Sequence, residues 1–483
     1  MGGGEGKNLF SREKKDNGAD VRPPPRDTID PCREQSITEI KEEPMKYRKY
    51  AAQIRICVSC LTAAVFLLIF SGLASRLAVV LKLQAAPVFM RMLSGFSLGA
   101  AAMTLFLLLS AFAAGRFYCA SFCPLGLLQD AAAYLSRRKS QKEKDLYMLR
   151  LFAAGAVYSL LVFGFHNGFL LLDPYSVSGR ILYPFTAGGA AALLGIVLLA
   201  VWKKRFFCTS LCPVGTLLGV FAKHGARQLV IGENCIHCGK CVKNCPSGCI
   251  DIGSGHIDNG RCVRCLNCYS LCPVQSIRWG KAAGPSDSSR RRFLRAAAGF
   301  VSGAAAGVVL AKTGLLAAAR KLRILPPGAG NERRFSQKCT ACMLCAANCP
   351  QKIIVPSRGG LGVELDLTRG ACSYNCSRCS NICPTGALTP LPLALKRRTK
   401  IAEARFYPVN CIAFQDGEKC GRCAAACPTG AITLRKNGTP RPVKQALCIG
   451  CGACQKVCPA SPKAMKISAI EQQSTTDVTE NKK

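Results

Sequence analysis

The sequence is poor in histidine, and this scarcity limits the redox chemistry that the chain can carry. It has only 4 histidines in 483 residues, and His166 is the only one in a long apolar segment. Haem iron in a membrane bundle needs axial side-chain ligands, so a di-haem cytochrome b is excluded. No C-x2-C-H motif occurs, which excludes an attached c-type haem. Any redox centre must therefore use other ligands.

Cysteine, by contrast, is abundant. The chain contains 32 cysteines, most of them in regular C-x2-C spacings that end in Cys-Pro. Disulfide frameworks belong to short secreted chains. Regular spacings followed by Cys-Pro in a long chain indicate ligation of iron–sulfur clusters instead.

Acidic residues are also scarce, and the chain is basic. Its 27 Asp and Glu stand against 65 Lys and Arg, which gives a formal charge of +38. A four-iron cluster with its four thiolates carries roughly −2, so six of them would lower the total to about +26. Many basic residues flank apolar segments, where anchoring on the cytoplasmic side of a membrane explains them. We therefore expect membrane lipid, and no nucleic acid, as a partner.

The first cysteine-rich unit lies between Gly232 and Arg278 and has two similar halves. Each half reads C-x2-C-x2-C-x3-C-P, the run of bacterial two-cluster ferredoxins. In this arrangement three thiolates come from one run and the fourth from the other. One predicted set is Cys235, Cys238, Cys241 and Cys272, and the other is Cys262, Cys265, Cys268 and Cys245. A zinc ribbon lacks the fourth Cys-Pro, so zinc is disfavoured.

Four further runs follow between Phe335 and Ile470 and predict two more ferredoxin-like pairs. Stretched spacings at Cys372 and Cys411 depart from the simple pattern, so these two ligands are less secure. The same crossing over predicts four sets: Cys339, Cys342, Cys345 and Cys383; Cys372, Cys376, Cys379 and Cys349; Cys411, Cys420, Cys423 and Cys458; Cys448, Cys451, Cys454 and Cys427. The sequence thus predicts six [4Fe–4S] clusters.

An internal repeat contains a different cysteine motif. Residues 116–126 read R-F-Y-C-A-S-F-C-P-L-G, and residues 205–215 read R-F-F-C-T-S-L-C-P-V-G. Each copy follows a pair of apolar segments, so both are expected on the cytoplasmic face. Cys119, Cys123, Cys208 and Cys212 are further candidate metal ligands. A structural helix end is the alternative, and the residues alone do not define the role.

Four apolar segments predict a membrane bundle. They are Ile54–Ala74, Leu93–Ala114, Leu149–Leu172 and Ala187–Trp202, and a helix needs about 20 residues to cross the hydrocarbon core. Basic groups before the first segment and after the second and fourth place these ends in the cytoplasm.

A fifth helix is expected after Ser289-Arg290-Arg291-Arg292-Phe293-Leu294-Arg295, which closely resembles a twin-arginine export signal. The alternative is the basic flank of an ordinary membrane helix. The small residues at 317–319 are compatible with cleavage by a signal peptidase after this helix.

The predicted fold class is a membrane α-helical bundle, of four helices plus a twin-arginine-type helix, with α+β two-cluster ferredoxin-like domains. The expected domains are a flexible cytoplasmic tail (1–50), a four-helix membrane domain with two C-x3-C-P motifs (51–228), a cytoplasmic two-cluster ferredoxin domain (229–282), a signal or anchor helix with linker (283–330), a periplasmic four-cluster ferredoxin-like domain (331–470) and a flexible tail (471–483).

On these motifs, residues from about 50 to 280 resemble the NapH/MauN family, and residues from about 286 to 470 resemble the NapG/MauM family. The resemblance implies a membrane quinol dehydrogenase module. Its partners would be the quinone pool, a periplasmic cytochrome or reductase, and the twin-arginine translocation machinery. It implies a multi-pass protein of the bacterial inner membrane, with a cytoplasmic N-terminus and a periplasmic C-terminal domain. The fusion of the two modules departs from the family pattern.

Quinol oxidation needs a proton acceptor near the membrane edge. His166 and Asp173 are candidates, although a buried structural histidine and an ordinary Asp-Pro turn explain them equally well. The catalytic residues therefore stay unknown at this point. A maturation or regulatory ferredoxin of the NosR or CcoG type, which shares the C-x3-C-P arrangement, is the alternative function.

Overall fold

A computed structural model describes residues 45–94, 97–136, 146–163, 172–183, 187–280, 290–313, 322–357, 362–417 and 419–476. These residues fall within one unit, Glu43–Lys483. His166, Ser289 and the alanines at 317–319 lie outside the described residues. So do positions 1–44 and 477–483 of the two predicted tails.

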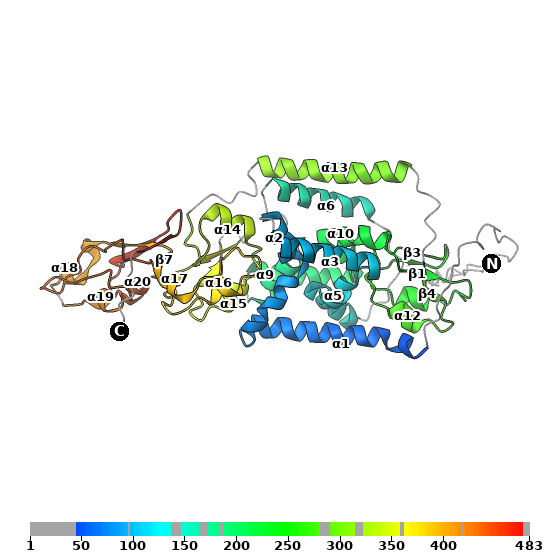
Figure 1. Cartoon of the computed structure of the whole chain (residues 1–483), viewed down its shortest axis with the longest axis horizontal. Coiled ribbons are helices and arrows are strands. Elements are labelled where there is room, and N and C mark those ends of the chain that lie inside the picture. The colour runs from blue at the N-terminus through cyan, green and yellow to red at the C-terminus, as the bar shows by residue number, and fades with distance from the viewer. Residues whose placement is uncertain are drawn as a thin grey trace, which may run out of the picture. The chain divides into compact units, whose positions relative to one another are not determined.

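The N-terminal half is helical (Figure 1). Its elements are α1 (Met45–Phe70), η2 (Ser75–Leu83), α2 (Ala85–Ser94), α3 (Leu98–Ala114), α4 (Phe117–Ser121), α5 (Pro124–Leu135), α6 (Tyr147–Val162), α8 (Pro174–Leu182), α9 (Ala187–Lys203), η3 (Phe207–Leu211) and α10 (Pro213–Lys223). Helix α1 begins at Met45, so the end of the predicted tail is already helical. Pro124 and Pro213 each stand at the first position of a helix, where a missing N–H costs nothing.

One described helix segment, Tyr50–Phe70, is long and apolar enough to cross a membrane. The other apolar helices, including α3, α6 and α10, are shorter than 18 residues in their apolar part. A bundle of four membrane-crossing helices is therefore not shown by the structure. Many large apolar side chains on these helices are exposed, among them Leu61, Leu105 and Leu198.

Helix α13 (Arg290–Lys312) packs along α6, and the two run in the same direction (Figure 1). Gly299, Gly303 and Gly307 repeat every four residues on α13 and face α6. A Cβ atom at Gly303 would come within 2.1 Å of the Phe152 carbonyl oxygen. Small residues at this spacing allow close approach of two helix backbones, as they do between membrane helices.

Gly303→Leu is expected to separate α13 from α6, because the Phe152 backbone cannot move aside for the new side chain. Overpacking of this kind typically costs about 1–3 kcal/mol. The measurement is the thermal unfolding of the purified chain in detergent. Gly195→Leu on α9 is the matched control, since a Cβ atom there meets nothing within 4 Å. Equal loss of stability in both variants would contradict the importance of the glycine contact.

The first ferredoxin unit contains two small antiparallel sheets and two short helices. Strand β1 (Gln228–Ile231) pairs with β4 (Ile277–Gly280), and β2 (Ile250–Asp251) pairs with β3 (His256–Ile257). Helices α11 (Lys240–Lys243) and α12 (Asn267–Leu271) each contain the third cysteine of their run, Cys241 and Cys268. The unit is thus the α+β arrangement expected for two clusters.

The C-terminal unit repeats this plan. Its helices are α14 (Glu332–Lys338), α15 (Leu344–Ala347), α16 (Arg378–Ile382), α17 (Leu393–Arg398), η4 (Pro408–Asn410), α18 (Ile412–Gln415), α19 (Arg422–Ala425) and α20 (Ala453–Val457). Strand β5 (Ile354–Pro356) pairs with β6 (Val363–Leu365), β8 (Glu403–Phe406) with β9 (Met465–Ser468), and β7 (Thr399–Lys400) with β10 (Ser474–Thr475). The last pair differs from the expectation of a flexible tail from residue 471, because β10 and Gln473 hydrogen-bond the domain.

Helix α1 contacts a different ferredoxin unit at each of its ends. Near its start, the Arg48 side chain donates to the backbone oxygens of Tyr269 (3.1 Å) and Ile277. Near its end, the Ile69 carbonyl accepts from Asn348 Nδ2 at 3.2 Å. At 1.5 Å per residue, Arg48 and Ile69 lie about 32 Å apart along the helix. The two units are therefore separated by the length of α1.

Candidate iron–sulfur sites

Three of the six predicted cysteine sets line cavities. The cavity in the first ferredoxin unit has an empty volume of about 370 Å³ and is bounded by Cys235, Cys238, Cys241 and Cys272. The last of these comes from the second run, as crossing over requires. Apolar side chains such as Ile231 and Ile277 complete the wall. Cys235, Cys238 and Cys241 come from the loop and short helix that precede Cys245 in the chain.

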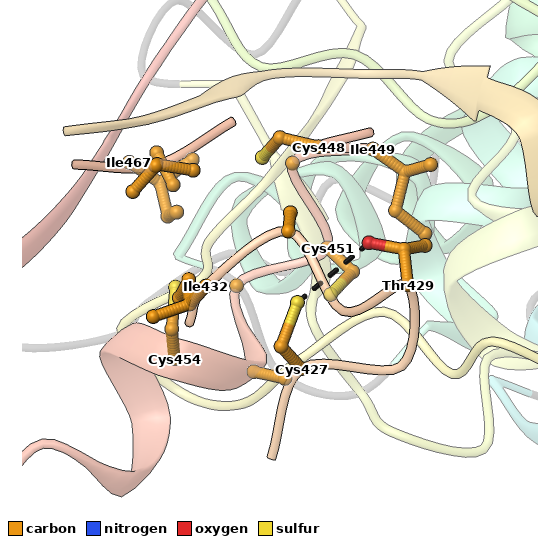
Figure 2. A pocket seen from close by; sticks show the side chains of 14 residues that line it. Cys427, Thr429, Ile432, Cys448, Ile449, Cys451, Cys454 and Ile467 are labelled. Atoms are coloured by element: carbon orange, nitrogen blue, oxygen red, sulfur yellow. Dashed lines mark hydrogen bonds between the residues drawn. The ribbon is translucent and has the colours of Figure 1, made fainter. Parts of the chain in front are cut away.

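The other two cavities lie in the C-terminal unit. One, of about 350 Å³, is lined by Cys411, Cys420, Cys423 and Cys458. The other, of about 310 Å³, is lined by Cys427, Cys448, Cys451 and Cys454, whose sulfurs surround it in Figure 2. There the Cys427 Sγ lies 3.6 Å from the Thr429 hydroxyl. Cys411 thus lies with its predicted partners despite the stretched spacing.

The remaining three sets are also brought together. In each set the side chains lie close enough for their charges to interact: Cys268 with Cys262, Cys265 and Cys245; Cys345 with Cys339, Cys342 and Cys383; Cys379 with Cys372, Cys376 and Cys349. Cys268 also interacts with Cys241, and Cys345 with Cys379, so for these three sets the division between neighbouring sites stays a prediction.

The donor set fits an iron–sulfur cluster. Each cavity offers four thiol groups among apolar side chains, and soft thiolate ligands select Fe–S centres. Burial raises the pKa of Cys241 and of Cys451 to about 11, so these thiols need a bound cation to lose their protons. Among the described residues no three His, Cys, Asp or Glu side chains converge on a single metal ion. A four-iron cube is wider than one ion and suits cysteines spaced around a cavity.

The sites of the C-terminal unit follow one another in space in the order third, fourth, sixth, fifth. The fourth run touches the sixth, because the Cys372 N–H donates to the Cys451 carbonyl at 2.8 Å. Gly452 packs against Leu367 at the same contact. In each predicted pair, every run supplies its fourth cysteine to the other site. The third site is therefore next to the fourth, and the fifth is next to the sixth. The sequence alone gave no sign that the sixth run lies nearer the fourth.

The two C-x3-C-P copies lie inside the helical half, where sequence analysis expected them on its cytoplasmic face. Cys119, Cys123, Cys208 and Cys212 are each buried and share one apolar core with Leu125. The cause is that the helix after each motif turns back into the bundle. Helix α5 follows the first motif and packs against α9, and α10 follows the second and packs against α3 and α6.

Helix α8 brings polar groups against the third site, and of these groups only Asp173 was a candidate from the sequence. Asp173 caps α8 by accepting from the Ser176 N–H and hydroxyl, each at 2.7 Å. Its Oδ1 atom and two nitrogens of Arg180 are buried without a hydrogen-bond partner, and the Tyr175 hydroxyl is buried beside Cys342. The backbone of α8 at Gly179 packs directly on the Cys342 carbonyl. Buried polar groups that lack partners are expected where a ligand binds.

Comparison with known families identifies iron–sulfur domains along most of the chain. Residues 96–143 and 185–231 match a 4Fe-4S binding domain, one match for each C-x3-C-P copy. Residues 234–276, 371–431 and 417–461 match one 4Fe-4S dicluster domain, and residues 338–388 match another.

Curated relatives give the same picture. The chain is 33% identical over 210 residues to the ferredoxin-type protein NapG of Escherichia coli, which covers 39% of this chain and 88% of NapG. It is 31% identical over 175 residues to the putative electron transport protein YccM of the same organism, covering 33% of this chain and 49% of YccM. It is 27% identical over 197 residues to the ferredoxin-type protein NapH of Haemophilus influenzae, covering 40% of this chain and 58% of NapH.

No solved structure matches the chain. The chain spans between about half and two thirds of the length of the first three curated relatives, at 63%, 49% and 48%. The cysteine sets, the 4Fe-4S domain matches and the extent of the NapG match agree. The chain therefore carries several 4Fe-4S domains and belongs to the NapH/NapG/MauN-type ferredoxin proteins.

Proposed function

We propose that this protein is bound in the bacterial inner membrane, oxidises quinol and passes the electrons through [4Fe–4S] clusters to a periplasmic reductase or cytochrome. The observation that carries the proposal is α1, with one ferredoxin unit bonded at each end. The distance of about 32 Å between these contacts is close to the hydrocarbon thickness of a bilayer, about 30 Å. The two units would then lie on opposite sides of the membrane.

The proposed topology has α1, α3, α6 and α9 crossing the membrane, and α13 as a fifth crossing. Their exposed apolar side chains would face lipid. Basic residues before α1 and after α9 favour a cytoplasmic N-terminus. The parallel packing of α13 on α6 supports the same direction of crossing for both helices. The first ferredoxin unit is then cytoplasmic, and the C-terminal unit is periplasmic.

We assign the 24 cysteines of the six crossed sets as ligands of six [4Fe–4S] clusters. The three cavities with four cysteines each support this assignment, as do the charge interactions among the cysteines of the other three sets. When bound, the clusters supply one-electron carriers in series. The protein's own role is to hold the clusters in a fixed order. In the C-terminal unit this order is third, fourth, sixth and fifth, and the fifth site is the farthest from the helical half.

The proposed quinol site is formed by Asp173, Tyr175 and Arg180. Asp173 is fully buried, and its free Oδ1 can accept a proton from a quinol hydroxyl. The buried Tyr175 hydroxyl lies near Cys342 and Cys383, two predicted ligands of the third site. Oxidation at this position would release electrons directly beside the first periplasmic cluster and protons on the periplasmic side.

The test of the proposed function is reduction of the full chain, purified anaerobically in detergent, by menaquinol and ubiquinol analogues. We expect at least one of them to bleach the cluster absorbance, and iron analysis to give at least about 24 irons per chain, four for each of six clusters. Fewer than about 20 irons would contradict the six clusters. Full iron content with no reduction by either quinol would contradict quinol as the donor.

A further inference from the structure

The two C-x3-C-P copies hold each other through reciprocal arginines. Arg116 of the first copy donates from Nη2 to the Cys208 carbonyl at 2.7 Å. Arg205 of the second copy donates from Nη1 to the Cys119 carbonyl at 2.9 Å. Both arginines are fully buried, with 1% and 0% of their surface exposed. The repeat in the sequence is thus a paired structure, in which each copy supports the first cysteine of the other.

The four thiols of this pair lie together, and those of Cys208 and Cys212 accept hydrogen bonds. Their charges are close enough to interact across the two copies, as between Cys123 and Cys208. Gln129 Nε2 donates to the Cys208 Sγ at 3.2 Å, and the Gly215 N–H donates to the Cys212 Sγ at 3.3 Å. Such N–H donors to cysteine sulfur stabilise the anionic thiolates of iron–sulfur centres and tune their potentials.

The surroundings of the thiols carry an excess of positive charge. Arg55 and Arg205 share the carboxylate of Asp130, at 3.2 and 2.5 Å. Arg116 pairs with no carboxylate among the described residues, and its Nε has no hydrogen-bond partner. Three buried arginines against one aspartate leave two positive charges in excess. Buried charge must be compensated, and a four-iron cluster with four thiolates carries roughly −2.

The pair lies midway along α1. The Ser59 hydroxyl and Arg55 both donate to the carbonyl of Ala120, between Cys119 and Cys123. Ser59 is about 15 Å along α1 from each of the two ferredoxin contacts, at Arg48 and Ile69. On the cytoplasmic side of the cysteine pair, Arg205 is near Cys265 of the second predicted set. On its periplasmic side, Tyr118 is near both Cys123 and Asp173.

We propose that the two copies jointly bind one further iron–sulfur cluster, with Cys119 and Cys123 from one copy and Cys208 and Cys212 from the other. This centre lies halfway across the membrane and relays electrons between the cytoplasmic pair of clusters and the periplasmic side. The proposal rests on the proposed function for its direction across the membrane. Each transfer moves one electron, so the donor centre is oxidised and the acceptor reduced by one unit. No bond is made or broken at the four cysteines.

The test is iron and acid-labile sulfide analysis of the full chain purified anaerobically in detergent. Seven four-iron clusters give about 28 irons and 28 sulfides per chain, and six give about 24. Cys119→Ala with Cys208→Ala is expected to lose about four of each. Cys57→Ala with Cys60→Ala is the matched control, because these cysteines are exposed on α1, and it should match the parent chain.

Equal iron in the parent chain and in the Cys119 and Cys208 variant would overturn the proposal, as would about 24 irons in the parent chain. A disulfide at these positions, found by thiol counting, would overturn it too. About 26 irons in the parent chain, falling by two in the variant, would support a two-iron cluster at the same place. If the variant does not fold, the parent count alone still decides between about 24 and a higher number. The count uses no quinol, so a failure of quinol oxidation leaves this test unchanged.

Discussion

Asp173→Asn is expected to slow reduction of the clusters by quinol by about 100-fold or more, while the iron content stays unchanged. General acid–base groups typically contribute factors of about 100 to 10,000. The substituted side chain keeps an oxygen that can accept from the Ser176 N–H and hydroxyl, so the start of α8 is preserved. It loses the ability to take a proton from quinol. The measurement is the rate of cluster bleaching by a quinol analogue, together with iron analysis.

Asp366→Asn is the control for this prediction. Asp366 also accepts from nearby groups, Thr368 and Arg369, but it lies in the C-terminal unit with its side chain partly open to solvent. That variant should be reduced at the parent rate. Tyr175→Phe should also slow reduction, because the hydroxyl near Cys342 is removed without change of shape. A parent rate in Asp173→Asn would show that this carboxylate is not the proton acceptor.

The four cysteines that line each of the three cavities could be grouped from the sequence, because most of the information is local. Three ligands of each cluster lie within a few residues, and the Cys-Pro at the end of the run marks the fourth. Even Cys411, with eight residues before the next cysteine, lies beside the partners that crossing over predicts. The order of the C-terminal sites was not predictable, because it depends on long-range contacts such as the one between Cys372 and Cys451.

The surroundings of the C-x3-C-P copies could not be read from the sequence in the same way. The repeat itself is visible, including the arginine that begins each copy, and this was the signal for a paired site. What pairs the copies is an exchange of hydrogen bonds between residues about 90 positions apart, such as Arg116 and Cys208. Helix α3 ends at Ala114, where the apolar segment was predicted to end, because Gly115 stops it. The Gly115 φ of 70° explains why glycine stands there.

The two arginines that precede α13 lead to the last prediction. In the proposed topology the C-terminal unit is periplasmic and holds four clusters; such a domain binds its metal as it folds, so it would cross the membrane already folded. A twin-arginine signal is the export signal for which residues 289–295 have the matching sequence. Arg290→Lys with Arg291→Lys keeps the positive charge but removes the arginine pair. We expect this variant to leave residues 335–470 in the cytoplasm.

The measurement is the accessibility of a C-terminal tag to protease in spheroplasts. The parent chain should expose the tag, and the Arg290 and Arg291 variant should protect it almost completely. Arg137→Lys with Arg138→Lys is the matched control, since it makes the same change in another basic segment of the chain. If the tag stays exposed in the Arg290 and Arg291 variant, positive charge alone carries the C-terminal unit across. Helix α13 would then be an ordinary membrane helix, held against α6 by its glycines and oriented by the charge of its first turn.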